Sequence, residues 1–360
     1  MANDMGKVET AIEASQKSVV SREKELGAGA EQIQGPVGLD IGTSHIVMAQ
    51  NKGKNIHTVK QLNAFFTIPS SKFTKKILVE NEVTFYEKNN LFYILGYSAE
   101  NFANMFNTNT RRTMEKGLLS AKEDEGINVL QAIINTLISK RKQEEIICFS
   151  SPGNPLDGPQ SVIYHESIIK MYLTSLGYKP TAINEGLATV MSELANDNFT
   201  GIGISMGGGM CNVCLAYLSV PVITYSIQKG GDYVDNMVGV SVGEPATTVK
   251  VVKESGFSLA KPAKDRVATA LHIYYEELVR NLLDSLESVL MSTDKIPKIA
   301  KPIPLVLSGG TVLPEGFRDL FEKVMREIEL PIEISEIRIA HDPLNTTAKG
   351  AMVMALSEEI

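Results

Sequence analysis

The stretch Gly201-Ile-Gly-Ile-Ser-Met-Gly-Gly-Gly-Met210 constrains the fold of this 360-residue chain more than any other. One apolar run enters three consecutive glycines, and a second, Val213–Val222, leaves them. Apolar runs bounded by glycine predict two strands joined by a tight turn. Glycines also let the backbone turn several N–H groups toward one anion, so Gly207, Gly208 and Gly209 are candidate phosphate ligands. A plain hairpin turn explains the same glycines, and this stretch alone leaves both interpretations open.

A second strand–turn–strand pattern lies earlier, at Val37–Met48. Asp40 ends the first strand, Gly42 makes the turn, and Thr43 and Ser44 offer hydroxyl and backbone N–H groups beside it. A carboxylate next to a glycine turn suits a hydrated magnesium ion, which keeps several waters and takes few protein ligands. Asp40 is therefore a candidate metal residue, and a hairpin with a capping carboxylate is the structural alternative.

Strands and helices alternate along the chain and predict the α/β class. Several strand-like runs follow one another between Ile56 and Leu95, and apolar residues at helical spacing over Leu130–Ile138 predict an amphipathic helix. A further helix is expected over Gln160–Leu176. Glu185 opens another helix, where its carboxylate either satisfies the helix dipole or polarises a water that faces a phosphate.

The amino-acid composition limits the classes of function that this chain can have. At 360 residues the chain is long enough for two domains or one large bilobal unit, and its 43% hydrophobic residues support sizeable cores. The net charge of −7 argues against a nucleic-acid-binding surface. Cys211 and Cys214 are expected on opposite faces of a strand, so we expect neither a metal site nor a redox pair there. No apolar run approaches the ~18 residues that span a bilayer, and no secretory leader is recognisable, so we expect a cytoplasmic protein.

Five motifs, in order over residues 37–354, resemble those of the ATPase superfamily of actin, the heat-shock chaperones and the sugar kinases. The two phosphate loops resemble Asp40–Ser44 and Ser205–Gly209, the latter followed by Gly230–Asp235; the two connecting helices resemble Ile183–Thr189 and Asp342–Gly350; and the adenosine motif resembles Leu305–Pro314. Gly230-Gly-Asp232 and Ser241–Pro245 most resemble rod-shape-determining bacterial actins (MreB) and their magnetosome-filament relatives (MamK).

The resemblance implies an actin-like ATPase fold: two lobes, each built on a mixed five-stranded sheet of ribonuclease-H-like type, with nucleotide in the cleft between them. Residues 36–180 would form the first lobe and 181–340 the second, and 341–360 would be a connecting helix that returns to the first lobe. Residues 1–35 would be a disordered or helical extension. Because the chain ends at Ile360, we expect no chaperone substrate domain.

The resemblance also implies ATP or ADP with Mg²⁺ as cofactors, and self-assembly into filaments. Asp40 would hold the hydrated magnesium, and Glu185 would orient the attacking water. The remaining site residues would contact the nucleotide: Gly42, Thr43, Ser44, Ser205, Gly207, Gly208, Gly209, Gly231, Lys250, Gly309 and Gly310.

Three departures from the family pattern keep other hypotheses open. Ser205 replaces the usual Asp, Met210 replaces the usual Thr, and Thr247 with Lys250 stand where Glu and Lys usually contact the purine. Losing a carboxylate and a hydroxyl beside the metal predicts slow or absent hydrolysis. The chain is therefore either a weak ATPase that polymerises or a non-hydrolysing scaffold. A small-molecule kinase is a third hypothesis, with Asp232 as its one candidate catalytic acid.

Contact with the inner face of the cell membrane is a separate hypothesis. Met105-Phe106 lies between Asn104 and Asn107, with Arg111 and Arg112 nearby, and resembles the lipid-inserting loop of bacterial actins. Phe106 packed against its own lobe is the equally weighted alternative.

Overall fold

The computed structural model describes residues 35–52, 55–106, 108–140, 144–156, 162–293 and 301–358. The N-terminal extension predicted over residues 1–35 lies outside these ranges except for Gly35, and Asn107 lies outside them too.

The first sheet has five strands in the order β10-β9-β1-β2-β3. An antiparallel meander comes first: β1 (Val37–Ile41), β2 (His45–Lys52) and β3 (Asn55–Leu62). The strands β9 (Glu145–Ser151) and β10 (Tyr178–Asn184) then add in parallel on the other side of β1. The central strand β1 is apolar except for Asp40 and almost wholly buried, as expected for a strand covered on both faces. β10 carries this sheet to Asn184, past the lobe boundary predicted at residue 180.

The second sheet repeats this topology, in the order β13-β12-β11-β14-β15. Here β11 (Gly201–Met206), β12 (Cys211–Tyr217) and β13 (Val220–Ile227) form the antiparallel meander. The parallel strands are β14 (Ile303–Ser308) and β15 (Ile334–Ile339). Cys211 and Cys214 are buried on opposite faces of β12, in different apolar clusters. Two mixed five-stranded sheets, one per lobe, are thus confirmed.

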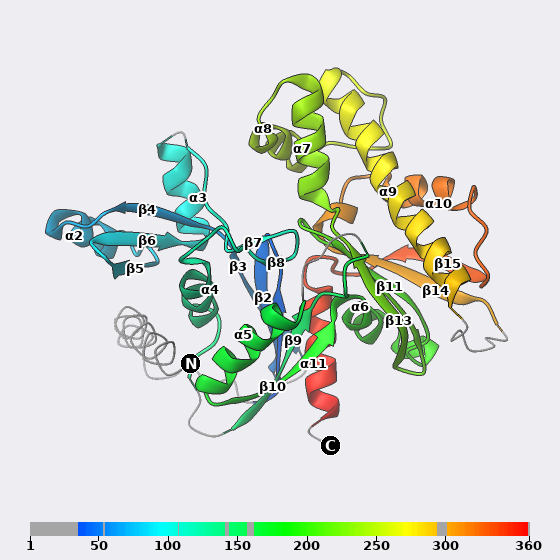
Figure 1. Ribbon diagram of the computed structural model, residues 1–360, viewed down its shortest axis with the longest axis horizontal. Helices are drawn as coiled ribbons and strands as arrows, with labels where there is room; N and C mark the ends of the chain where they lie inside the picture. The colour runs from blue at the N-terminus through cyan, green and yellow to red at the C-terminus, as the bar shows by residue number, and fades with distance from the viewer. Residues whose placement is uncertain are drawn as a thin grey trace.

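Two helices lie between the sheets (Figure 1). α6 (Glu185–Glu193) packs on β11 and β12 of the second sheet, and α11 (Thr346–Ser357) packs on β1 and β9 of the first. The two helices also pack on each other, and one apolar cluster joins Ala188 and Val190 of α6 to Ala351 of α11. This helix pair therefore forms part of the contact between the two sheets.

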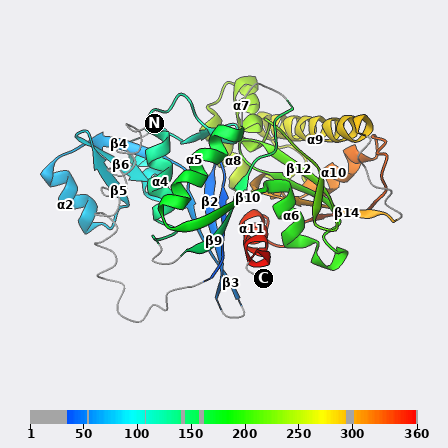
Figure 2. The ribbon, with the colours of Figure 1, turned by 60° about the horizontal axis from the view of Figure 1, so that its bottom comes forward.

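Each lobe has further elements, and Figure 2 shows α2 at one end of the molecule and α10 toward the other. In the first lobe they are β4 (Phe65–Pro69), α2 (Lys72–Glu80), β5 (Phe85–Lys88), β6 (Leu91–Leu95), α3 (Gly96–Met105), β7 (Met114–Glu115), β8 (Leu118–Leu119), α4 (Gly126–Asn135) and α5 (Val162–Ser175). In the second lobe they are α7 (Gly231–Val242), α8 (Ala246–Glu254), α9 (Arg266–Ser292) and α10 (Phe317–Met325), with short 3₁₀ turns at Ala195–Asp197 and Gly310–Val312.

The amphipathic helix predicted over residues 130–138 is α4, which begins earlier and ends at Asn135. Leu137 and Ile138 follow in turns, where their backbone N–H groups both bond to the carbonyl of Ile134. Ile138 stays buried in the first-lobe core, so the apolar spacing marks burial correctly and the helix end imprecisely.

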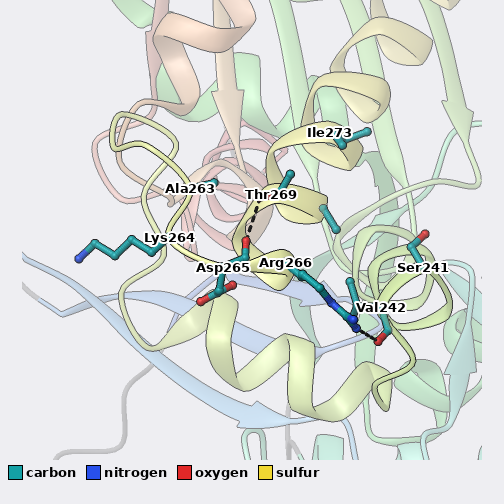
Figure 3. A pocket seen from close by; sticks show the side chains of 9 residues that line it. Ser241, Val242, Ala263, Lys264, Asp265, Arg266, Thr269 and Ile273 are labelled. Atoms are coloured by element: carbon teal, nitrogen blue, oxygen red, sulfur yellow. Dashed lines mark hydrogen bonds between the residues drawn. The ribbon is translucent and has the colours of Figure 1, made fainter.

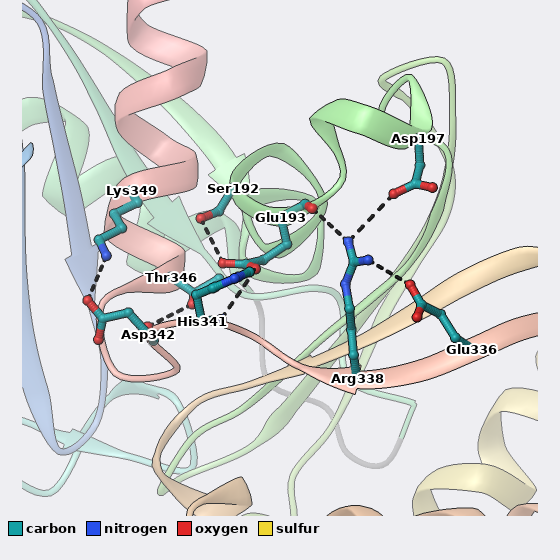
Figure 4. A network of polar contacts seen from close by, with 9 residues as sticks. All are labelled: Ser192, Glu193, Asp197, Glu336, Arg338, His341, Asp342, Thr346 and Lys349. Atoms are coloured by element: carbon teal, nitrogen blue, oxygen red, sulfur yellow. Dashed lines mark hydrogen bonds and ion pairs between the residues drawn. The ribbon is translucent and has the colours of Figure 1, made fainter. Parts of the chain in front are cut away.

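A polar network ties the end of α6 to the connection between β15 and α11 (Figure 4). His341 donates its backbone N–H to the Glu193 carboxylate and places its ring nitrogen Nδ1 3.2 Å from the same group. Arg338 reaches the Glu193 carbonyl and the Asp197 carboxylate, while Lys349 of α11 pairs with Asp342. The network thus links the end of α6 to β15 and to the segment that leads into α11.

None of the helices in the described residues is both long and apolar enough to cross a bilayer.

Candidate functional site

A cavity of about 430 Å³ lies between the two lobes. The first lobe contributes the β1–β2 turn, and the second contributes the β11–β12 turn, the start of α7, part of α8 and the end of β14. The lining includes every site residue that the sequence predicts: Asp40, Gly42, Thr43, Ser44, Glu185, Ser205, Gly207, Gly208, Gly209, Gly231, Lys250, Gly309 and Gly310. Segments far apart in the chain therefore meet around one space.

The two glycine turns occupy the same place in their sheets and touch each other. The β1–β2 turn closes with a hydrogen bond from Gly42 N–H to the His45 carbonyl, and the β11–β12 turn closes from Gly207 N–H to the Met210 carbonyl. Gly208 approaches Ser44 so closely that any Cβ at position 208 would collide with the Ser44 hydroxyl. Residues 42–44 and 207–209 thus face each other across the lobe boundary.

Gly309 has a different reason to be glycine. Its φ of +92° lies in the left-handed region, and a Cβ there would collide with the backbone of Met206 in β11. The close contact at this position is therefore between two parts of the second lobe. Gly310 has more space, since a Cβ there would meet Leu344 at an ordinary 3.5 Å.

Two carboxylates stand close together at the cavity. Asp40 Oδ1 accepts a hydrogen bond of 2.8 Å from Ser150, and Glu185 accepts one of 3.1 Å from Ser205. Burial raises the pKa of Asp40 above its usual range. Burial, together with the neighbouring charge of Asp40, raises the pKa of Glu185. Two partly buried carboxylates that repel each other favour a bound cation between or beside them.

This donor set fits magnesium only in combination with other ligands. In the described residues, no group of three or more His, Cys, Asp or Glu side chains could hold a metal ion. Magnesium ordinarily takes one or two carboxylates and completes its shell with waters and substrate phosphates. Asp40 beside two glycine turns meets that requirement.

Ser205 and Met210, the two departures in the second turn, have their own partners. The Ser205 hydroxyl donates to Glu185, so it positions a carboxylate instead of supplying one. Met210 is 3% exposed and packs with Leu118 and Val162 of the first lobe. Thr43 is also buried, and its hydroxyl accepts from the backbone N–H of Gly117.

The cavity lining also includes residues that were not among the predicted site residues. Lys253 and Asp235 form a buried ion pair with a shortest N–O distance of 2.7 Å, and Glu254 and Phe257 complete this part of the lining. Lys250 lies 3.9 Å from Glu254, one helical turn on, whereas Thr247 is absent from the lining. The spacing of α8 could have revealed Lys253 and Glu254, since residues three and four apart share a helix face.

Several basic side chains lie near His45, which also lines the cavity. Burial lowers the pKa of His45 to about 4, and the charges of Lys60, Lys250 and Arg112 add to the effect. Arg112 crosses the lobe boundary to pair with Asp232 at 2.7 Å. Asp232, the candidate acid of the kinase hypothesis, is therefore engaged with an arginine.

A second hollow, of about 560 Å³, lies away from the glycine turns between the end of α7 and the start of α9 (Figure 3). Arg266 bonds to the carbonyl of Val242 there, and Asp265 caps α9. It contains none of the predicted site residues.

Comparisons with known proteins agree with this architecture. The model of the Volactin family matches residues 36–355. The MamK double helical filament shares 18% identity, with a TM-score of 0.66 over 90% of this chain and 99% of that chain. MreB5 of Spiroplasma citri bound to ADP shares 15% identity, with a TM-score of 0.64 over 90% and 97%. Apo pSK41 ParM shares 10% identity, with a TM-score of 0.53 over 90% and 97%. No curated protein matches.

The predicted resemblance to bacterial actins is confirmed at the level of the fold by these structures. Because the family model covers nearly the whole of the described chain, this protein belongs to the volactin family and has the actin-like fold.

Proposed function

We propose that this volactin binds ATP or ADP with Mg²⁺ in the inter-lobe cavity and assembles into filaments. The observation that carries the proposal is the meeting of residues 42–44 with residues 207–209 beside the Asp40 and Glu185 carboxylates. Solved relatives support it: MreB5 of S. citri has structures bound to ADP and to AMPPNP, and MamK forms a double helical filament.

Each residue has a role in this proposal. Backbone N–H groups of Gly42, Thr43 and the glycines at 207–209 would donate to phosphate oxygens. Asp40 would hold the hydrated magnesium, which supplies positive charge to neutralise the phosphates. Glu185, held by Ser205, would accept a proton from a water and orient it. Lys250, Gly309 and Gly310 would lie along the nucleoside.

The proposal includes slow hydrolysis, and a non-hydrolysing scaffold is the second candidate. The observation that favours the scaffold is the pair of departures in the second turn, because Ser205 adds no negative charge and Met210 offers no hydroxyl. A kinase has less support, since Asp232 is paired with Arg112.

Titration, sedimentation and phosphate release test the proposal together. We expect the purified chain to bind Mg-ATP and Mg-ADP in calorimetric titrations and to pellet with ATP. Phosphate release that accompanies the pellet supports the weak ATPase, and polymer without release supports the scaffold. An absence of binding to either nucleotide contradicts the whole proposal.

We also propose that the protein is cytoplasmic and makes a peripheral contact with the membrane through Met105 and Phe106. These side chains are 77% and 61% exposed at the end of α3, although the Phe106 ring also stacks on Phe66 at 5.9 Å. We expect Phe106→Asp to reduce co-flotation with liposomes. Equal flotation of the variant and the wild type argues for the packing role of Phe106 alone.

A further inference from the structure

Met210 leaves the second lobe and buries its side chain in the first. It ends the glycine turn between β11 and β12, yet its apolar neighbours are Leu118 of β8 and Val162 of α5. Only 3% of Met210 is exposed. A flexible thioether fills an irregular gap well, and here the gap lies across the boundary between two lobes.

The β7–β8 hairpin is shaped to receive this side chain. Gly117, at the hairpin turn, has a φ of +77°, and a Cβ there would lie only 2.5 Å from both Sδ and Cε of Met210. The absence of a side chain at residue 117 therefore makes room for Met210. His165 of α5 contacts the same hairpin, because its Nδ1 accepts a hydrogen bond of 3.3 Å from the backbone N–H of Leu119.

Three backbone segments meet at this point. A Cβ at Gly209 would collide with the Thr43 hydroxyl, and it would lie 2.5 Å from the backbone nitrogen of Gly117. Gly117 in turn donates its N–H to the Thr43 hydroxyl at 3.1 Å. The first glycine turn, the second glycine turn and the hairpin thus pack together as one unit. Among these residues, Met210 is the one whose apolar side chain extends from the second lobe and is buried in the first.

We propose that Met210 is an inter-lobe positioning residue that fixes the second glycine turn against the first and thereby slows nucleotide release. The inference rests on the proposed nucleotide binding. Separating residues 207–209 from residues 42–44 requires Met210 to withdraw from the apolar site formed by Leu118, Val162 and Gly117. Exposing a buried methionine side chain disfavours that opening by at least about tenfold. A nucleotide held by both turns would leave correspondingly slowly.

Other contacts across the boundary remain when Met210 is changed. The loop after β9 bonds to β13 through Ser226 N–H to the Asn154 carbonyl at 3.0 Å and Leu156 N–H to the Ser226 carbonyl at 2.9 Å. We therefore expect Met210 variants to fold with both lobes in place.

The first test is the rate at which a fluorescent ADP analogue, bound with Mg²⁺, dissociates during a chase with unlabelled ADP. We expect Met210→Ala to release it roughly tenfold or more faster, and Met210→Leu to stay near the wild-type rate because it restores most of the buried volume. Met114→Ala is the matched control: Met114 is equally buried, in β7 of the same hairpin, but it packs in the core of the first lobe. This control should lose thermal stability and keep the wild-type release rate.

The second test needs no nucleotide. Hydrogen exchange of the free protein should become faster at residues 207–210 and 117–119 in Met210→Ala, and Met114→Ala should leave residues 207–210 unchanged. Unchanged exchange and an unchanged release rate in Met210→Ala overturn the inference while nucleotide binding stands. If the wild type binds no nucleotide, both the proposed function and the proposed effect on nucleotide release are wrong. Hydrogen exchange then tests by itself whether Met210 holds the second glycine turn in place.

Discussion

Glu185 is the first residue of α6, and its carboxylate accepts a hydrogen bond from Ser205. Because it lies beside Asp40 and accepts from Ser205, its position is fixed before any ligand arrives. We expect Glu185→Gln to lower phosphate release by about 10²–10⁴-fold, since an amide cannot take the proton of an attacking water. Affinity for Mg-ADP should change little, because the variant keeps the shape of the side chain. Phosphate release and calorimetric titration check the two halves, and wild-type release by the variant contradicts the role.

Ser205 gives a second prediction at this scale. Ser205→Asp puts a third carboxylate beside Asp40 and Glu185, and without Mg²⁺ we expect it to destabilise the fold by about 1–3 kcal/mol. Mg-ADP should then raise the melting temperature of the variant more than that of the wild type. Ser205→Ala is the control, because it removes the hydrogen bond to Glu185 without adding charge. If both variants respond alike to Mg-ADP, no cation lies next to residue 205.

Individual residues also show where sequence reasoning reaches its limit. The glycine turns and the Asp40 carboxylate could be assigned to one cavity because five motifs in order resemble those of the actin-like ATPases, whereas each local pattern alone also fits a plain hairpin. The pairing of Lys253 with Asp235 could not be predicted, since a buried ion pair depends on how α7 and α8 pack. Met210 is the clearest case: its sequence neighbours belong to the second lobe, and its contacts belong to the first.

Among the elements, α5 and the β7–β8 hairpin are joined by a buried histidine. Burial lowers the pKa of His165 to about 4, from 6.5 in a free chain. Between these values the unfolded chain binds the proton and the folded chain does not, so stability falls as the pH drops from about 6.5 toward 4. The loss attributable to His165 should be of the order of 2–3 kcal/mol.

Denaturant unfolding at pH 7.5 and pH 5 checks this prediction. His165→Asn should lose part of its stability at pH 7.5 but show a smaller further loss at pH 5 than the wild type does. His57→Asn, which changes an exposed residue of β3, is the control and should keep the wild-type difference. An equal pH difference in His165→Asn and the wild type contradicts the assignment.

The strands that flank each glycine turn are the elements that the sequence predicted best, and in both lobes they pair as antiparallel neighbours. The apolar run Val213–Val222 predicts one strand, whereas a turn at Leu218 and Ser219 divides it between β12 and β13. The ends of helices were less accurate, as α4 shows, because turns at a helix end continue its apolar spacing.

In the whole molecule, two halves of the same topology face each other, and charge as well as apolar burial joins them. Arg112 in the first lobe and Asp232 at the start of α7 form the ion pair, with side chains 28% and 31% exposed. A pair this exposed contributes at most about 1 kcal/mol, so Arg112→Ala should weaken Mg-ADP binding by about fivefold or less. Arg112→Lys keeps the charge, so its affinity for Mg-ADP should lie between those of the wild type and Arg112→Ala.

Salt distinguishes this electrostatic contribution from a loss of packing. At about 1 M salt the screening length falls to about 3 Å, and the attraction between Arg112 and Asp232 weakens strongly. The affinities of the wild type and Arg112→Ala should therefore converge as NaCl rises, whereas Met210→Ala should keep its faster release at every salt concentration because apolar burial is not screened. A constant ratio between wild type and Arg112→Ala from low to high salt would show that Arg112 acts through packing, and the ion pair would then have no part in holding the lobes together.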